Sequence, residues 1–118
     1  MPLHLYIINL QALLSQASNR HQQVASFALL CLGIIESLTN GLMSVTEAPR
    51  LFFHAENCLF VRKSLKDRIA DQIMSHGVQL PDLFDTLPLE EAEREFQREL
   101  TTMHSLCLKL LEDKQIAA

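Results

Sequence analysis

The sequence contains few of the residues that build tight turns, aromatic pockets and disulfide frameworks. Its 118 residues include three Gly, four Pro, one Tyr and no Trp. All-β folds need many turns, and turns favour Gly and Pro, so this composition disfavours them. The three cysteines form no CxxC pair, and an odd number does not suit a disulfide framework. We therefore expect a protein of a reducing compartment without a large aromatic-lined pocket.

A strongly basic stretch is also missing. The net charge is −4, and the longest basic cluster is the short run Arg62, Lys63, Lys66 and Arg68. Because neutralisation of phosphates supplies most of the affinity for nucleic acid, the sequence predicts no nucleic-acid partner. The negative charge is local: residues 81–99 carry seven acids and two bases, a net of −5, whereas residues 1–80 carry five acids and six bases, a net of +1.

No hydrophobic run is long enough to predict a membrane span. The longest, VASFALLCLGII over residues 24–35, has twelve residues, and a bilayer span needs about twenty. The stretch MPLHLYIINLQALL lacks the basic region and the small-residue cleavage site of a signal peptide. With a hydrophobic content of 48%, the chain is expected to be a cytoplasmic globular protein that makes no contact with a membrane.

The spacing of the apolar residues predicts an all-α fold. A segment from about residue 20 to residue 40 is apolar on most of its circumference, which is typical of a central helix. A second regular stripe predicts a long carboxyl-terminal helix over about 88–112; it consists of Leu89, Ala92, Phe96, Leu100, Met103, Cys107 and Leu110. We expect residues 1–118 to form a compact single-domain bundle of four to five helices.

The remaining helices are shorter. Leu3, Ile7, Leu10 and Leu14 share one helical face. Ser44 and Glu47 form a capping-box pattern before the apolar residues LFF (51–53), with Thr46 as the alternative cap that would place Pro49 in the first turn.

A further helix is expected from Asn57 or Ser64 to His76, where Gly77 would end it. Its inward-facing residues are Leu59, Leu65, Ile69 and Ile73. The following VQLPDLFDTLP (78–88) is expected to be a loop with at most a short turn at 82–85.

The candidate functional residues are acidic and lie around the start of the last helix. They are Asp82, Asp85, Glu90, Glu91, Glu93 and Glu95. One interpretation is that the helix acids complement the macrodipole and face water. The other is an acidic surface that attracts a basic protein partner. Asp82 and Asp85 favour the second interpretation, because they are expected outside the helix and need no macrodipole.

Two His–Cys pairs have the spacing of metal ligands. His54 and Cys58 are four residues apart, His104 and Cys107 three, so each pair can share a helical face. Together they would supply two nitrogens and two sulfurs, a set that binds zinc. The alternative is that Cys58 and Cys107 are buried apolar residues. We favour the alternative and expect no metal and no cofactor.

An enzyme is not predicted. The sequence lacks GxSxG, HExxH, DxDxDG and a phosphate-binding loop, and its carboxylates lie on a polar helix face where no cleft is expected. Another possibility comes from the apolar residues Leu13, Leu14, Phe52, Phe53 and Phe60. They either pack inside or leave an exposed patch through which the protein forms a homodimer.

The segment ALLCLGIIESLTNGLMSVTEAPRLFF (28–53) resembles a family of small bacterial proteins that is classed as a domain of unknown function. The matching features are the leucine-rich helix with Leu32-Gly33, Gly41 after it, and a second helix that opens at Ser44–Ala48 and ends in LFF. The chain departs from the family around His76-Gly77, where the family's acidic pair is not plainly reproduced. The resemblance implies a bacterial source and a helical fold, and supplies no catalytic residues.

Two functions follow from these patterns. The first is a non-enzymatic acidic protein that binds a protein partner with a basic patch, in the manner of bacterial immunity or antitoxin-like proteins. The second is a self-associating structural or regulatory protein that forms a homodimer through apolar helix faces.

Overall fold

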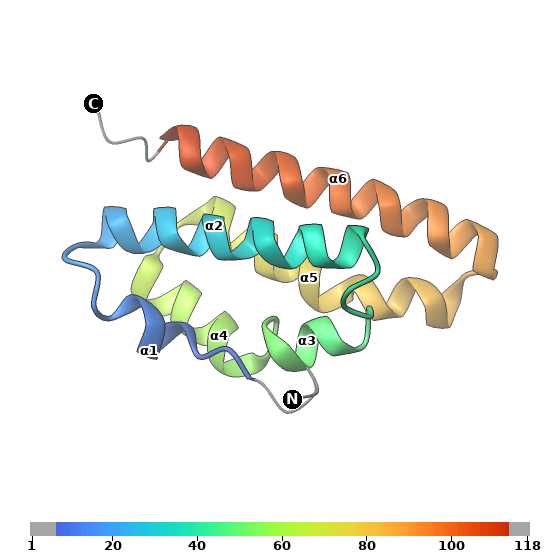
Figure 1. Cartoon of the computed structure of the whole chain (residues 1–118), viewed down its shortest axis with the longest axis horizontal. Helices are drawn as coiled ribbons and strands as arrows, with labels where there is room; N and C mark the ends of the chain where they lie inside the picture. Colours follow the sequence, from blue (N-terminus) through green and yellow to red (C-terminus); the bar gives the residue numbers. More distant parts are fainter. Residues whose placement is uncertain (1–6, 114–118) are drawn as a thin grey trace.

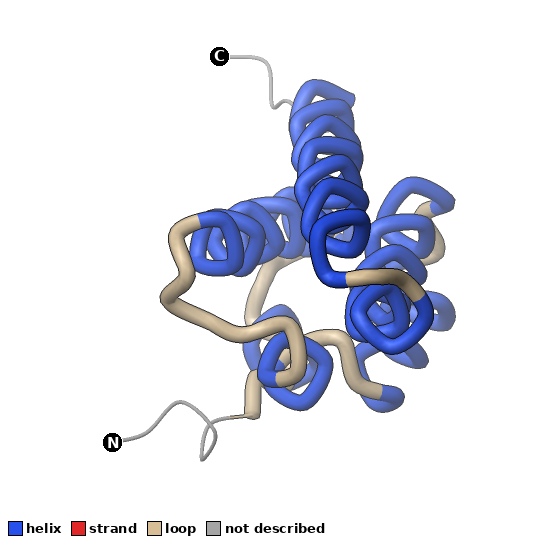
Figure 2. Tube along the Cα trace, turned by 90° about the vertical axis from the view of Figure 1, so that its right-hand side faces the viewer, coloured by secondary structure: helices blue, strands red, loops and turns tan. Residues whose placement is uncertain are grey.

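The computed structural model describes residues 7–113, which form a helical bundle without a β-strand in that range. Three helices are long: α2 (Arg20–Thr39), α5 (Arg68–Thr86) and α6 (Leu89–Asp113). Helix α6 lies over α2 and α5 and packs along both of them (Figures 1 and 2). The short elements cover the side of α2 and α5 that faces away from α6: α1 (Leu10–Leu14), α3 (Glu47–Leu51), α4 (Ala55–Phe60) and the π-helical turn η2 (Val61–Leu65). The prediction of an all-α fold is confirmed.

Helix α2 begins and ends where its local sequence directs. The Asn19 side chain accepts a hydrogen bond from the backbone N–H of Gln22 at 2.9 Å, which satisfies a donor at the helix start. At the other end Gly41 has a φ of +71°, a conformation that glycine adopts without a Cβ penalty. The predicted stripe is buried: Val24, Phe27, Ala28, Cys31, Ile34, Ile35 and Leu38. The central helix is therefore confirmed at 20–39.

The predicted capping box before α3 is also present. The Ser44 N–H donates to Glu47 Oε1 at 2.9 Å, and the Glu47 N–H donates to Ser44 Oγ at 3.1 Å. Thr46 takes the residue position before α3, so Pro49 lies in the first turn, where a proline is tolerated. The helix ends at Leu51 and is followed by Phe52 and Phe53. Both are buried, and their rings meet edge to face at a centroid distance of 5.1 Å.

The predicted end of the next helix is wrong. Helix α5 continues through Gly77 and Pro81 to Thr86, so most of the expected loop over 78–88 is helical. A Cβ on Gly77 would lie 2.3 Å from Cδ1 of Phe53. Gly77 therefore allows the Phe53 ring to pack directly against the helix backbone, and it does not end the helix.

Tertiary packing also offsets the effect of Pro81 inside α5. Proline lacks the N–H that would bond to the Gly77 carbonyl and costs about 3 kcal/mol in a helix interior. Beyond it, Phe84 contacts Phe96 of α6 edge to face, at a centroid distance of 5.6 Å. Just before it, Leu80 is buried. These contacts hold the last turns of α5 against α6.

Two other boundaries differ from the prediction for local reasons. Leu3 lies outside the described residues, and α1 begins only at Leu10, because Asn9 caps it by accepting from the Ala12 N–H at 3.1 Å. Ile7 precedes the helix and is 65% exposed. The single helix expected to start at Asn57 or Ser64 is divided into α4, capped by His54, the turn η2, and α5, capped by Asp67.

The predicted inward faces are correct with a few exceptions. Leu65 and Ile73 are buried and Ile69 is half-buried, but Leu59 is 48% exposed. Of the apolar residues that we considered for a homodimer patch, Leu14, Phe52 and Phe53 are buried and Phe60 is half-buried. Leu13 alone among these five is exposed.

One buried polar side chain fixes the short elements to each other. Asn57, which is 1% exposed, accepts from the Leu10 N–H at 3.0 Å and donates to the carbonyls of Phe52 at 2.7 Å and Ile8 at 2.9 Å. Its amide thus connects the chain before α1 with the end of α3. Because the Asn57 side chain is shielded from solvent, the Leu10 N–H and the Phe52 carbonyl would lose this partner without it. The Ile8 carbonyl would keep a second contact, with Nε2 of His54 at 3.0 Å.

We predict that Gly77→Ala destabilises the protein, although alanine is the better helix former. The new methyl group must displace the Phe53 ring, and overpacking of this kind costs about 1–3 kcal/mol. Gly33→Ala in α2 is the matched control: nothing lies within 4 Å of the position that the new Cβ would take, so it should stabilise by up to about 1 kcal/mol. Denaturant unfolding of both variants checks this, and two shifts of the same sign would contradict the close contact.

We predict that Asn57→Ala lowers the free energy of unfolding by about 1–3 kcal/mol for each backbone group left unpaired. Asn19→Ala makes the same chemical change at an exposed helix cap and should cost about 1 kcal/mol. Thermal and urea unfolding measure both. A loss at Asn57 no larger than that at Asn19 would show that its hydrogen bonds do not hold the short elements.

Candidate functional site

The predicted acidic residues gather at one corner of the molecule. Helix α5 ends at Thr86 and α6 begins at Leu89, so Asp82 and Asp85 lie close in sequence and space to the start of α6 (right-hand end of Figure 1). We call this cluster the acidic corner; it consists of Asp82, Asp85, Glu90, Glu91, Glu93 and Glu95. Most of its side chains are exposed, with Glu95 half-buried.

The two halves of the acidic corner have opposite local electrostatics. Glu90 and Glu91 lie in the first turn of α6, where the partial positive charge of the helix favours a carboxylate. Asp82 and Asp85 lie at the carboxyl end of α5, where the partial charge is negative and disfavours them. The sequence predicted that these two residues lie outside a helix, and this prediction is wrong. The helix macrodipole nevertheless gives no reason for their presence.

Two acids of the stretch are engaged by neighbouring residues. Glu95 Oε1 lies 3.3 Å from Nη1 of Arg98, one turn along α6. Glu99 Oε2 lies 2.6 Å from Nδ1 of His76 on α5, and both side chains are about one-third exposed, at 34% and 32%. The His76–Glu99 contact joins the two helices, so Glu99 is separate from the acidic corner. The sequence did not predict this contact, because residue spacing identifies neighbours within one helix and these two residues lie on different helices.

An apolar side chain projects among the acids. Leu89 is the first residue of α6 and is 68% exposed, although the apolar stripe predicted that it faces inward. The stripe continues correctly at Ala92, Leu100 and Met103, which are buried. The first turn of α6 extends past the end of α2 (Figure 1), so α2 does not cover this part of the stripe.

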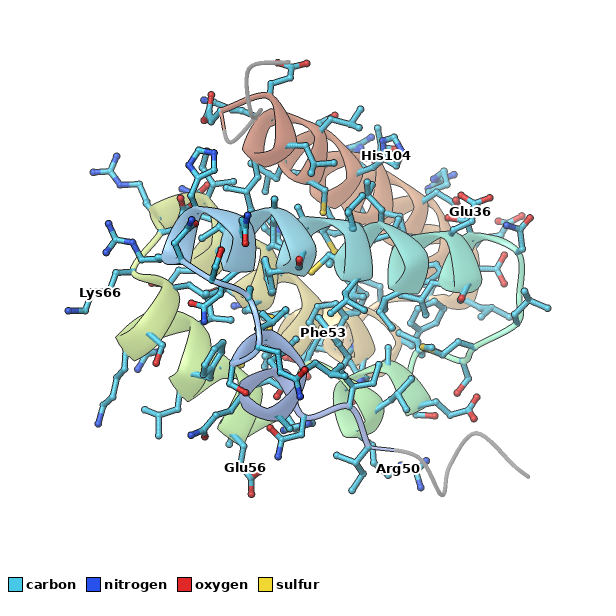
Figure 3. The ribbon with its side chains drawn as sticks, turned by 60° about the vertical axis from the view of Figure 1, so that its left-hand side comes forward. Glu36, Arg50, Phe53, Glu56, Lys66 and His104 are labelled. Atoms are coloured by element: carbon cyan, nitrogen blue, oxygen red, sulfur yellow. The ribbon has the colours of Figure 1, made fainter. Side chains whose placement is uncertain are left out.

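The short basic run over residues 62–68 lies at the other end of the molecule. Arg62 and Lys63 belong to η2, Lys66 follows it, and Arg68 begins α5. Lys66 is at the far left of Figure 3, and Glu36, near the end of α2, is at the far right. The basic run and the acidic corner therefore lie toward opposite ends of the molecule.

The structure does not bring together the four residues that were considered as metal ligands, His54, Cys58, His104 and Cys107. His54 caps α4, with its Nδ1 3.4 Å from the Asn57 backbone nitrogen and its Nε2 3.0 Å from the Ile8 carbonyl oxygen. Cys107 is buried in the core, whereas His104 is exposed on α6. Within residues 7–113, no three His, Cys, Asp or Glu side chains are placed to hold a metal ion. The two pairs fail to meet because α4 and α6 lie on opposite sides of the core.

The environments of Cys31 and Cys58 favour thiols over thiolates. Burial, together with the neighbouring thiol of Cys107 on α6, raises the pKa of Cys31 well above its usual range. Cys58 lines a surface hollow of about 340 Å³ with Arg62 and Asp71. Burial raises the pKa of Cys58, and the nearby Arg62 guanidinium only partly opposes this effect. A nucleophilic cysteine needs the opposite shift.

The comparisons give no relative from which residue roles could be transferred: no family model, no curated protein and no solved structure matches this chain.

Proposed function

We propose that this protein is a non-enzymatic helical module that binds a basic protein partner through its acidic corner. Such a module would act as immunity or antitoxin-like proteins do, by covering the positive surface of the partner. The source implied by the resemblance of residues 28–53 is bacterial, and the composition favours the cytoplasm.

The observation that carries the proposal is the position of Asp82 and Asp85. A carboxylate near the carboxyl terminus of a helix lowers the stability of the fold by about 0.3–1 kcal/mol, whereas a positive charge there raises it by a similar amount. Asp85 occupies this unfavourable position in the last turn of α5, and Asp82 lies one residue before that turn. A positive partner surface would offset the cost. Residues that reduce stability where they lie are characteristic of binding sites.

Leu89 gives the acidic corner a second kind of contact. Protein interfaces commonly combine an apolar anchor with a polar rim, and charges at the rim mainly increase the association rate and the specificity. Leu89 is 68% exposed and is followed directly by Glu90 and Glu91. This arrangement suits a protein partner. Nucleic acid would instead be repelled by the carboxylates.

We predict that Asp82→Lys/Asp85→Lys abolishes capture of the partner from extract of the native host and also raises the free energy of unfolding by about 0.3–1 kcal/mol per site. The gain in stability follows because lysine suits the carboxyl end of α5. Glu90→Lys/Glu91→Lys should also abolish capture but lower the stability, because these acids suit the start of α6. Pull-down combined with urea unfolding measures both effects.

Glu56→Lys/Glu112→Lys is the matched control for these variants. It reverses the same number of charges at exposed positions outside the acidic corner, and it should retain the captured partner. Capture by the wild type should also weaken as salt rises, because salt screens exposed charges. Unchanged affinity in both corner variants would contradict the proposed function.

A further inference from the structure

The outer side of the α2–α6 pair lacks the charges that an exposed helix face normally carries. Helix α2 has no Asp, Glu, Lys or Arg between Arg20 and Glu36, and α6 has none between Glu99 and Lys109. The core explains only the inward residues of these segments. Leu29 of α2 is 60% exposed and Leu108 of α6 is 43% exposed.

Helical spacing places these leucines on one continuous surface. A hollow of about 240 Å³ lies between α2 and α6 and is lined on one helix by Glu36 and Thr39 and on the other by Gln97, Thr101 and His104. Residues three, four and seven positions away share the same helix faces. We call the resulting surface the α2–α6 face; it consists of Ala25, Leu29, Leu32, Glu36, Thr39, Gln97, Thr101, His104, Leu108 and Leu111. Figure 3 shows Glu36 and His104 at the edge of the molecule, whereas Phe53 lies in its interior.

We infer that the α2–α6 face is covered by a second copy of this chain, in a two-fold dimer whose axis runs along the groove between the two helices. The helices are antiparallel, with Ile35 and Glu36 opposite Leu100 and Thr101. Leu29 lies seven residues before Glu36 on α2, and Leu108 lies seven residues after Thr101 on α6. Because the helices are antiparallel, Leu29 and Leu108 therefore lie at the same height along the groove. Rotation about a two-fold axis along the groove leaves the height of each residue along the axis unchanged. It brings α2 of one copy against α6 of the other.

The side chains that this axis pairs are complementary. Leu29 of each copy meets Leu108 of the other, and Glu36 approaches Thr101 and His104, which can both donate hydrogen bonds to a carboxylate. Every helix in the resulting four-helix arrangement has antiparallel neighbours, the topology of common four-helix bundles. The face thus matches itself in apolar area as well as in polar groups, as a two-fold interface requires.

A lipid surface is the competing occupant. By length and composition α2 could cross a membrane, although the central helix of a globular bundle passes the same test and 39% of the relevant window is buried here. Helices that lie on a membrane carry Lys or Arg beside their apolar face. Helical spacing places four acids and one base on or beside the α2–α6 face: Glu36, Glu90, Glu93, Glu112 and Arg94. This excess of acids favours a second copy over a lipid surface.

We predict that the wild-type chain changes from monomer to dimer as its concentration rises in sedimentation velocity, and that dimer formation persists at high salt. Leu29→Glu and Leu108→Glu should each weaken the dimer by about tenfold or more, since each removes a buried leucine contact and introduces a charge. Both positions are exposed in the single chain, so the helical circular dichroism of the variants should stay unchanged.

Leu42→Glu is the matched control. Leu42 is 70% exposed in the segment after α2, outside the α2–α6 face, and its replacement should leave the dimer intact. A wild type that stays monomeric at every concentration, or a dimer that Leu29→Glu leaves unchanged, would overturn the inference. Flotation of the monomer with lipid vesicles would also overturn it and assign the face to a membrane. The dimer does not depend on the acidic corner, so Asp82→Lys/Asp85→Lys should not affect it.

Discussion

The packing of the Phe53 ring against the backbone of Gly77 is the contact on which the acidic corner depends. Because Gly77 has no Cβ, the ring can lie against α5 without displacing it, and the helix continues past Pro81 to Thr86. A helix that ended at Gly77 would leave the following acids on a loop of variable geometry. A contact in the core therefore determines where charges lie on the surface.

Helix α6 connects the two surfaces for which we propose partners. Its 25 residues extend about 37 Å, close to the 45 Å longest dimension of the molecule. Its first turns belong to the acidic corner, and its uncharged middle belongs to the α2–α6 face. The two surfaces differ in chemistry: the first would attract a partner by charge, and the second by burial of leucines. The two surfaces, as defined, share no side chain.

Helices with strong local signals were predictable from the sequence. The caps at Asn19 and Ser44 and the apolar stripes of α2 and α6 depend on residues within a few positions of each other, so spacing alone identifies them. Helix α5 was not predictable in this way. Gly77 and Pro81 both favour a helix end locally, and the contacts that overrule them come from Phe53 and Phe96, on other elements.

By itself, the sequence determined the all-α fold class, the extent of α2, the stripe of α6 and the identity of the acidic cluster. Each of these depends on local periodicity or on composition. Only the tertiary structure decided that α5 reaches Thr86, that Glu99 pairs with His76 and that Leu29, Leu89 and Leu108 remain uncovered. The reason is physical: whether an apolar or charged side chain is buried depends on which other element covers it, and that element is distant in the sequence.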